Sequence, residues 1–127
     1  MKRKRALELC RDLWDELSKT GIDEKEGTKF CEKHPSLNSD CPCCEYVSKF
    51  PKIYRSVGLS IRPALDCKRC PLKKAWPFDD LVAPCINDES PYERWGCAST
   101  KKERKKYARI IRDAAIAELK KYKGYTE

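Results

Sequence analysis

The chain has 127 residues and a net charge of +8, with 38% charged and 40% hydrophobic residues. This length suits one domain with a modest core, and no segment approaches the roughly 18 apolar residues of a membrane span. The basic N-terminus lacks the apolar stretch of a signal peptide and carries acidic residues from Glu8 onward, unlike a transit peptide. We therefore expect a protein of the reducing cytoplasm without membrane contact, where clustered cysteines are metal ligands rather than disulfides.

Residues 1–21 are predicted to form an amphipathic N-terminal helix. Apolar side chains recur there at helical spacing, and Gly21 is well placed to end the helix. Cys10 lies within the apolar stripe, so it is interpreted as a small buried residue. The stripe consists of Leu7, Cys10, Leu13, Trp14 and Leu17.

Residues 22–98 form a cysteine-rich centre that differs from both ends of the chain. This segment holds all eight prolines and eight of the nine cysteines, and it shows no long alternation of apolar and polar residues. We expect short helices joined by turns around a metal site, with Pro42 and Pro71 each in the first turn of such a helix.

Residues 99–124 are predicted to form a basic C-terminal helix. Thr100 and Glu103 have the spacing of a capping box, and Gly124 is expected to end the helix. The apolar stripe is rich in alanine, which suits close packing against the N-terminal helix: Ala108, Ile111, Ala115, Leu119 and Tyr122. The predicted fold is a mainly α single domain, residues 1–127, with two terminal helices around an irregular metal-stapled centre.

The strongest chemical signal is the spacing C-x2-C-x22-C-x2-C formed by Cys41, Cys44, Cys67 and Cys70. Two such turns supply four thiolates for tetrahedral Zn²⁺, with Zn–S distances of about 2.3 Å. Basic side chains that offset the charge of a four-thiolate site surround the second pair: Lys68, Arg69, Lys73 and Lys74. The sequence therefore predicts a structural zinc site.

The choice of ligands has alternatives. Cys85 can replace Cys41 in a set with Cys44, Cys67 and Cys70. A second zinc ion would need further ligands, for which Cys31, His34, Cys43 and Cys97 are the candidates, although Cys31, His34 and Cys97 are slightly better explained as ordinary residues. A [4Fe–4S] cluster is the rival to zinc, but these cysteines are spread more widely than in ferredoxins, so zinc is favoured.

Four segments together resemble a set of small cysteine-cluster proteins commonly encoded by bacteriophages. These segments are CPCCEY, CKRCPL, Cys85 and SPYERW at residues 90–95, and the resemblance covers roughly residues 40–96. It implies metal binding at Cys41, Cys44, Cys67, Cys70 and Cys85. It also implies a partner, because small phage proteins often bind a host protein or nucleoprotein machine of defence or transcription in the cytoplasm of the bacterial host. Cys43 and the Cys31–His34 pair depart from the pattern.

No enzymatic activity is predicted, because the chain has one histidine and lacks the H-x-E, HExxH and glycine-rich phosphate motifs. Two binding roles remain, with a protein partner slightly ahead of nucleic acid. In the first, Tyr92 and Trp95 are aromatic anchors, although a core position over the metal loop is the favoured interpretation of both residues.

In the second role, basic residues follow a phosphate backbone with weak sequence preference. One basic group is Lys68, Arg69, Lys73 and Lys74 with the aromatic Trp76. The other lies close to one face of the C-terminal helix: Lys101, Lys105, Arg109 and Arg112. A charged helix face that only interacts with solvent is an equally good interpretation of this pattern.

Overall fold

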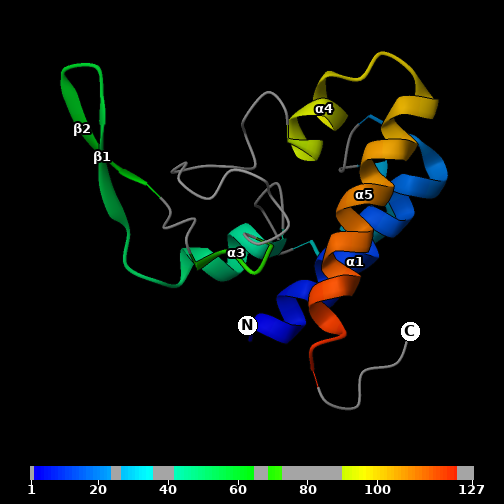
Figure 1. Cartoon of the computed structure of the whole chain (residues 1–127), viewed down its shortest axis with the longest axis horizontal. Helices are drawn as coiled ribbons and strands as arrows, with labels where there is room; N and C mark the ends of the chain where they lie inside the picture. Colours follow the sequence, from blue (N-terminus) through cyan, green and yellow to red (C-terminus); the bar gives the residue numbers. More distant parts are fainter. Residues whose placement is uncertain (1, 24–26, 36–41, 65–68, 73–89, 123–127) are drawn as a thin grey trace.

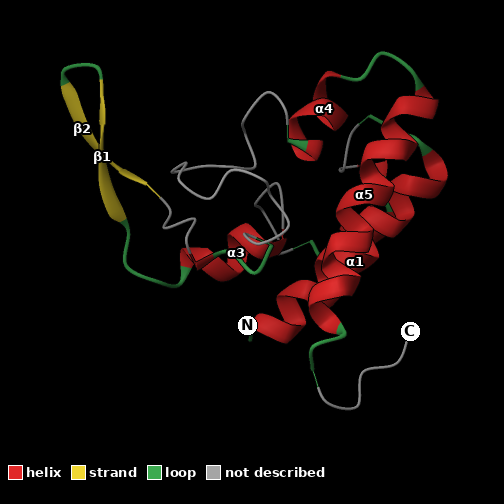
Figure 2. Cartoon of the chain, in the orientation of Figure 1, coloured by secondary structure: helices red, strands yellow, loops and turns green. Residues whose placement is uncertain are grey.

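The computed structural model of the chain describes residues 2–23, 27–35, 42–64, 69–72 and 90–122. In these segments the protein is mainly helical, as predicted, with one small sheet (Figures 1 and 2). The helices are α1 (Arg3–Thr20), α2 (Lys29–Lys33), α3 (Pro42–Ser48), α4 (Pro91–Cys97) and α5 (Lys101–Leu119). The strands are β1 (Ile53–Val57) and β2 (Ser60–Ala64). No helix within the described segments has the length and apolar character to cross a membrane.

The two long helices, α1 and α5, pack side by side, so the predicted pairing of the terminal helices is confirmed (Figure 1). Small residues on α5, Ala108 and Ala115, are fully buried at this contact and let the two backbones approach closely. Both predicted apolar stripes are buried apart from Tyr122, which is half-buried. Helix α4 packs on α5 and completes this side of the core.

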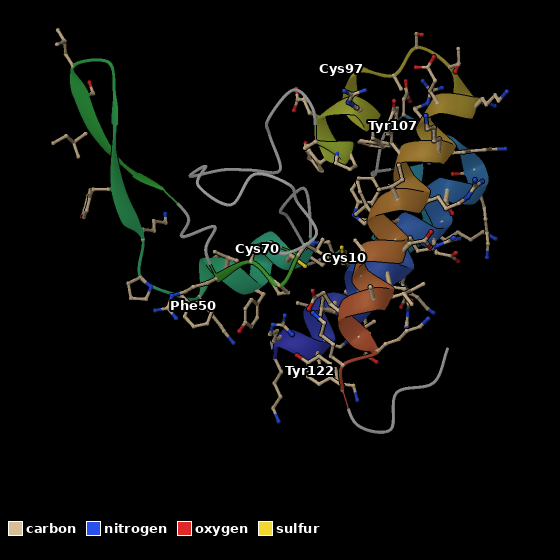
Figure 3. The ribbon with its side chains drawn as sticks, in the orientation of Figure 1. Cys10, Phe50, Cys70, Cys97, Tyr107 and Tyr122 are labelled. Atoms are coloured by element: carbon tan, nitrogen blue, oxygen red, sulfur yellow. The ribbon has the colours of Figure 1, made fainter. Side chains whose placement is uncertain are left out.

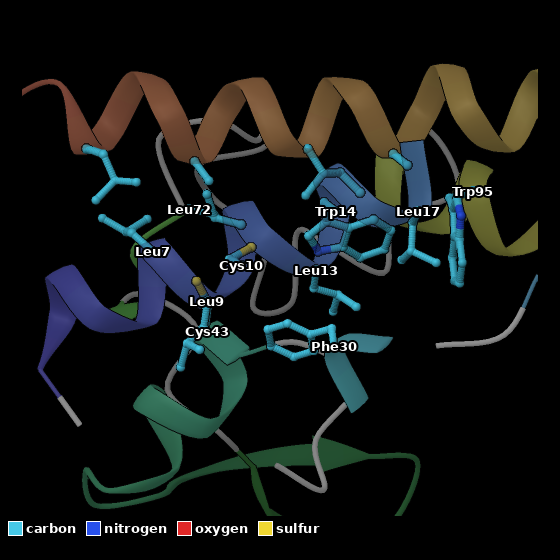
Figure 4. Packing of buried hydrophobic residues seen from close by; sticks show 14 residues of the cluster. Leu7, Leu9, Cys10, Leu13, Trp14, Leu17, Phe30, Cys43, Leu72 and Trp95 are labelled. Carbon is cyan, nitrogen blue, oxygen red and sulfur yellow. The ribbon is translucent and has the colours of Figure 1, made fainter. Parts of the chain in front are cut away.

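A second face of α1 packs against the cysteine-rich centre. Helices α2 and α3 both contact α1, and Figure 4 shows Phe30 and Cys43 on the side of α1 that faces away from α5. The predicted stripe included Leu13 but missed Leu9, which is buried on this face. Because α1 is covered on two sides, its buried surface is wider than the stripe of a helix that packs against one neighbour.

Local sequence signals place most helix ends. Gly21 adopts φ +66° and donates its N–H to the carbonyl of Leu17, as expected for a glycine that ends a helix. The Thr100 hydroxyl accepts the Glu103 N–H at 3.1 Å, which confirms the N-cap of α5. Helix α3 begins at Pro42, also as predicted.

Two predicted helix boundaries are wrong. Helix α5 ends at Leu119 rather than continuing toward Gly124, which lies outside the described residues. The next residues form tight turns, in which the Tyr122 N–H donates to the carbonyl of Leu119 at 3.0 Å. Pro71 lies with Leu72 in a turn rather than in a helix, Leu72 is buried in the core, and the following residues lie outside the described segments.

The hairpin of β1 and β2 was not predicted. The strands are antiparallel and pair Ile53 with Ala64 and Val57 with Ser60, leaving the two-residue turn Gly58–Leu59. Gly58 has φ +62°, which suits the first position of a type II′ turn. Pro63 argues against a central strand, but it is tolerated because each strand of a two-stranded sheet has a free edge. The hairpin extends away from the helices (Figure 1).

Candidate metal centre

The structure brings the first cysteine helix and the segment around Cys70 together. Helix α3 carries Cys43 and Cys44, and Phe50 follows its last turn. The guanidinium carbon of Arg69 lies 4.6 Å from the centroid of the Phe50 ring. Figure 3 shows Cys70 beside α3. The described members of the two C-x2-C pairs therefore belong to neighbouring parts of the fold.

The β hairpin explains how residues that follow it in the chain can come back toward α3. Because Ile53 pairs with Ala64, the chain leaves α3, turns at Gly58–Leu59 and comes back to the level at which the first strand began. Residues 69–72 then pack beside α3, with Leu72 buried in the same core as Cys43. The 22-residue spacer between Cys44 and Cys67 thus contains an out-and-back excursion.

Four cysteines from different parts of the chain share one apolar environment. Cys10 of α1 is fully buried, as predicted, and Cys43 of α3 is 1% exposed (Figure 4). Cys31 of α2 and Cys70 are partly buried and pack against the same cluster. The cysteine-rich centre is therefore joined to the helical core through its thiol-bearing residues.

The predicted zinc ligands are described only in part. Cys41, Cys67 and Cys85 lie outside the described residues, as do Lys68, Lys73, Lys74 and Trp76. Cys44 lies in α3. Among the described residues, no three His, Cys, Asp or Glu side chains are grouped so as to hold a metal ion. The zinc site remains a prediction, supported by the approach of α3 to the Cys70 segment.

The four candidate ligands of a second metal are not assembled. His34 is the C-cap of α2, and its ring lies 4.7 Å from that of Phe30. Cys97 is exposed at the end of α4, with its Sγ 3.9 Å from Glu93 of the same helix. Figure 3 shows Cys97 at α4 and Cys70 apart from it, beside α3. The described geometry therefore gives no support to a site of Cys31, His34, Cys43 and Cys97.

The basic face predicted on α5 borders α1. Arg112 donates from Nη1 to Oδ1 of Asp15 at 3.1 Å and from Nη2 to Oδ1 of Asp113 at 2.9 Å. Although burial favours the neutral acid, the hydrogen bonds from Lys19 and Arg112 lower the pKa of Asp15 below its ordinary value. Arg112 thus joins the two helices. Of the four predicted contact residues, Lys101, Lys105 and Arg112 border α1, whereas Arg109 is exposed away from it.

Trp95 is a core residue rather than an exposed anchor. Its side chain is 6% exposed, and its ring packs edge-on against Trp14 with the centroids 5.1 Å apart. Tyr92 is half-buried and lies 5.9 Å from Trp14. Of the two interpretations of Trp95, this burial favours the core position, because α4 turns that side chain toward Trp14 of α1.

Sequence reasoning missed a polar cluster at the opposite end of the helix pair. Arg3 donates to the hydroxyl of Tyr122 at 2.7 Å and to the carboxylate of Glu118 at 3.3 Å. Burial opposes the charge on Glu118, but hydrogen bonds from Lys121 and Arg3 lower the pKa of this carboxyl overall. The cluster links the first turn of α1 to the last turn of α5. No pattern in the sequence predicted it.

Comparisons of the chain with protein-family models, with curated proteins and with solved structures found no match. What the protein does is therefore inferred from its own residues.

Proposed function

We propose that the chain is a structural-zinc protein that acts by binding another macromolecule. The observation that supports metal binding is the packing of residues 69–72 beside α3. It brings the segment with Cys70 next to the helix that contains Cys44. In this proposal Cys41, Cys44, Cys67 and Cys70 bind one Zn²⁺ tetrahedrally, with Cys85 as the alternative to Cys41. Arg69 next to Cys70 offsets part of the negative charge of four thiolates.

The short elements of the centre give the metal a physical purpose. Helix α3 has seven residues, and the sheet has two strands of five residues each. Helices and hairpins this short are marginal in water by themselves. A structural zinc ion contributes its binding free energy directly to folding. It would therefore hold α3 and the base of the hairpin in a fixed arrangement against α1.

The proposed biological role is binding rather than catalysis. A catalytic zinc keeps an open coordination position and usually has histidine ligands, whereas this chain has one histidine, whose ring packs at a tilt against Phe30. The resemblance to phage-encoded cysteine-cluster proteins supports a host protein or nucleoprotein machine as the partner, in the cytoplasm of the bacterial cell. The net charge of +8 supports a partner with acidic surface or phosphate groups.

Elemental mass spectrometry of the full-length protein, purified without chelator, tests the metal. We expect one zinc ion per chain, which Cys44→Ser and Cys70→Ser abolish and the matched control Cys97→Ser retains, because Cys97 is exposed on α4. A metal-free wild-type protein, or equal loss in the control, would contradict the proposal. Iron in place of zinc would identify the site as an iron–sulfur centre.

Circular dichroism after chelation separates a structural metal from an incidental one. We expect helical and strand signal from the centre to disappear when zinc is removed, while the α1–α5 pair retains part of its helicity. An unchanged spectrum after verified metal removal would refute the structural role. Affinity purification from nuclease-treated host lysate tests the partner, and a stoichiometric protein is the expected result for a host machine.

A further inference from the structure

Among the described residues, the β hairpin carries the three most exposed large apolar side chains. Tyr54 and Ile61 are 74% and 71% exposed, and Leu59 at the turn is fully exposed. Tyr54 pairs with Pro63 and Ser56 with Ile61, so Tyr54 and Ile61 occupy one face of the hairpin two residues apart. Exposed apolar clusters of this kind mark sites where another molecule binds.

The same segment is basic in sequence. Residues 46–65 contain four lysines and arginines and no acidic residue. Arg55 pairs directly with Arg62 across the two strands, and like charges at opposed positions destabilise an antiparallel pair. At the base of the hairpin, the Lys49 ammonium lies 4.3 Å from the Tyr46 ring, which holds a further cation there.

Both faces of the hairpin carry apolar positions, because Ile53 and Val57 share a face with Arg55 and Arg62. The register that puts Tyr54 and Ile61 on one face puts the Arg55–Arg62 pair on the other. A flat protein surface contacts one face, whereas a groove contacts both faces and the tip. Insertion into a bilayer would place the unpaired edge groups of both strands in hydrocarbon, which is costly. A groove with charged walls therefore fits this hairpin best.

We propose that the β1–β2 hairpin is an arm that enters a groove of double-stranded DNA. A two-stranded ribbon fits the major groove of B-DNA, which is about 12 Å wide, whereas the deep groove of RNA excludes side chains. Arg55 and Arg62 bind phosphates, and Tyr54, Leu59 and Ile61 contact sugars and base edges. This inference rests on the proposed role in macromolecular binding and names the partner, and it does not depend on the identity of the metal.

Fluorescence anisotropy with the metal-loaded full-length protein and a labelled duplex of roughly 20 base pairs tests the arm, at about 50 and 200 mM salt. We expect micromolar binding of the wild type at low salt. Arg55→Ser with Arg62→Ser should weaken binding about tenfold and reduce the slope of log affinity against log salt by about two. Leu59→Ser should weaken binding without changing that slope, and its exposed position leaves the core intact.

The matched control is Lys102→Ser with Lys106→Ser, which removes the same charge from exposed positions on α5. This control should leave the affinity for DNA nearly unchanged. An equal loss of affinity in the control would mean that only net charge matters, and it would refute the proposal of a DNA-binding arm. Absence of wild-type binding at low salt overturns it too, as does Leu59-dependent binding to phosphatidylserine vesicles in place of DNA. A nuclease-resistant protein captured through the hairpin would keep the proposed function and refute the DNA arm. If the arginine variant fails to fold, the Leu59→Ser result decides.

Discussion

Replacing Gly21 with alanine should destabilise the junction of α1 and α5 by about 2–3 kcal/mol. Gly21 has φ +66°, a conformation that costs an alanine roughly 1–2 kcal/mol. The new Cβ would also lie 3.1 Å from Cβ of Lys101 and 3.2 Å from its carbonyl oxygen. Because these atoms belong to the first turn of α5, relief requires the helices to separate slightly, at a cost of about 1 kcal/mol.

Urea unfolding followed by circular dichroism measures this change, and the melting temperature should fall by on the order of 10 °C. Gly21→Asn retains the contact but tolerates the left-handed conformation, so its loss should be smaller. Gly96→Ala is the matched control, because its Cβ would meet nothing within 4 Å and it lies inside α4. It should stabilise the protein by about 0.5–1 kcal/mol. Equal stabilities of Gly21→Ala and Gly96→Ala would refute this account of the junction.

Trp14→Ala should cost about 3–5 kcal/mol in urea unfolding, since the fully buried ring packs edge-on against Trp95; a loss under 1 kcal/mol would mean that this part of the core is loosely packed. Glu118 has a folded-state pKa below the ordinary 4.5, so its contribution to stability is present above pH 4.5 and lost as the pH falls through the folded pKa. Glu118→Gln should therefore make the free energy of unfolding depend less steeply on pH below pH 4.5. An unchanged pH dependence would show that other carboxyls control it. Glu16→Ala should cost about 1–2 kcal/mol, because Glu16 accepts the N–H groups of Lys29 and Phe30 at 2.7 and 2.9 Å. Hydrogen exchange should then rise selectively in α2, and uniform exchange across the core would argue against this tether.

The helical frame of this protein follows from local patterns in its residues. The apolar period of residues 3–20 and 101–119 marks a buried stripe whatever the partner is, because side chains three or four residues apart share a helix face. Gly21, Thr100 and Pro42 mark helix ends through their own backbone or side-chain chemistry, which acts over a few residues. The spacing of the two C-x2-C pairs predicts metal binding for the same local reason.

The hairpin shows where such local signals end. Its strands are short, and Tyr54, Leu59 and Ile61 face solvent instead of a core. The segment therefore lacks the clear apolar–polar alternation that marks a half-buried strand. Pairing of Ile53 with Ala64 is a non-local contact that depends on the whole turn. Once formed, the hairpin returns the chain to α3, and this return supports the proposed zinc site.

Tertiary structure alone decided the roles of individual charged and aromatic residues. Arg112 belongs to the predicted basic face, yet it pairs with Asp15 because α1 lies beside that face. Trp95 is buried because α4 packs where the Trp95 ring contacts the ring of Trp14. Arg3 and Glu118 are 115 residues apart and meet because two helices of similar length run alongside each other. Periodicity predicts which face of a helix is buried, but only the packed structure decides which neighbour covers it and which charges that neighbour brings.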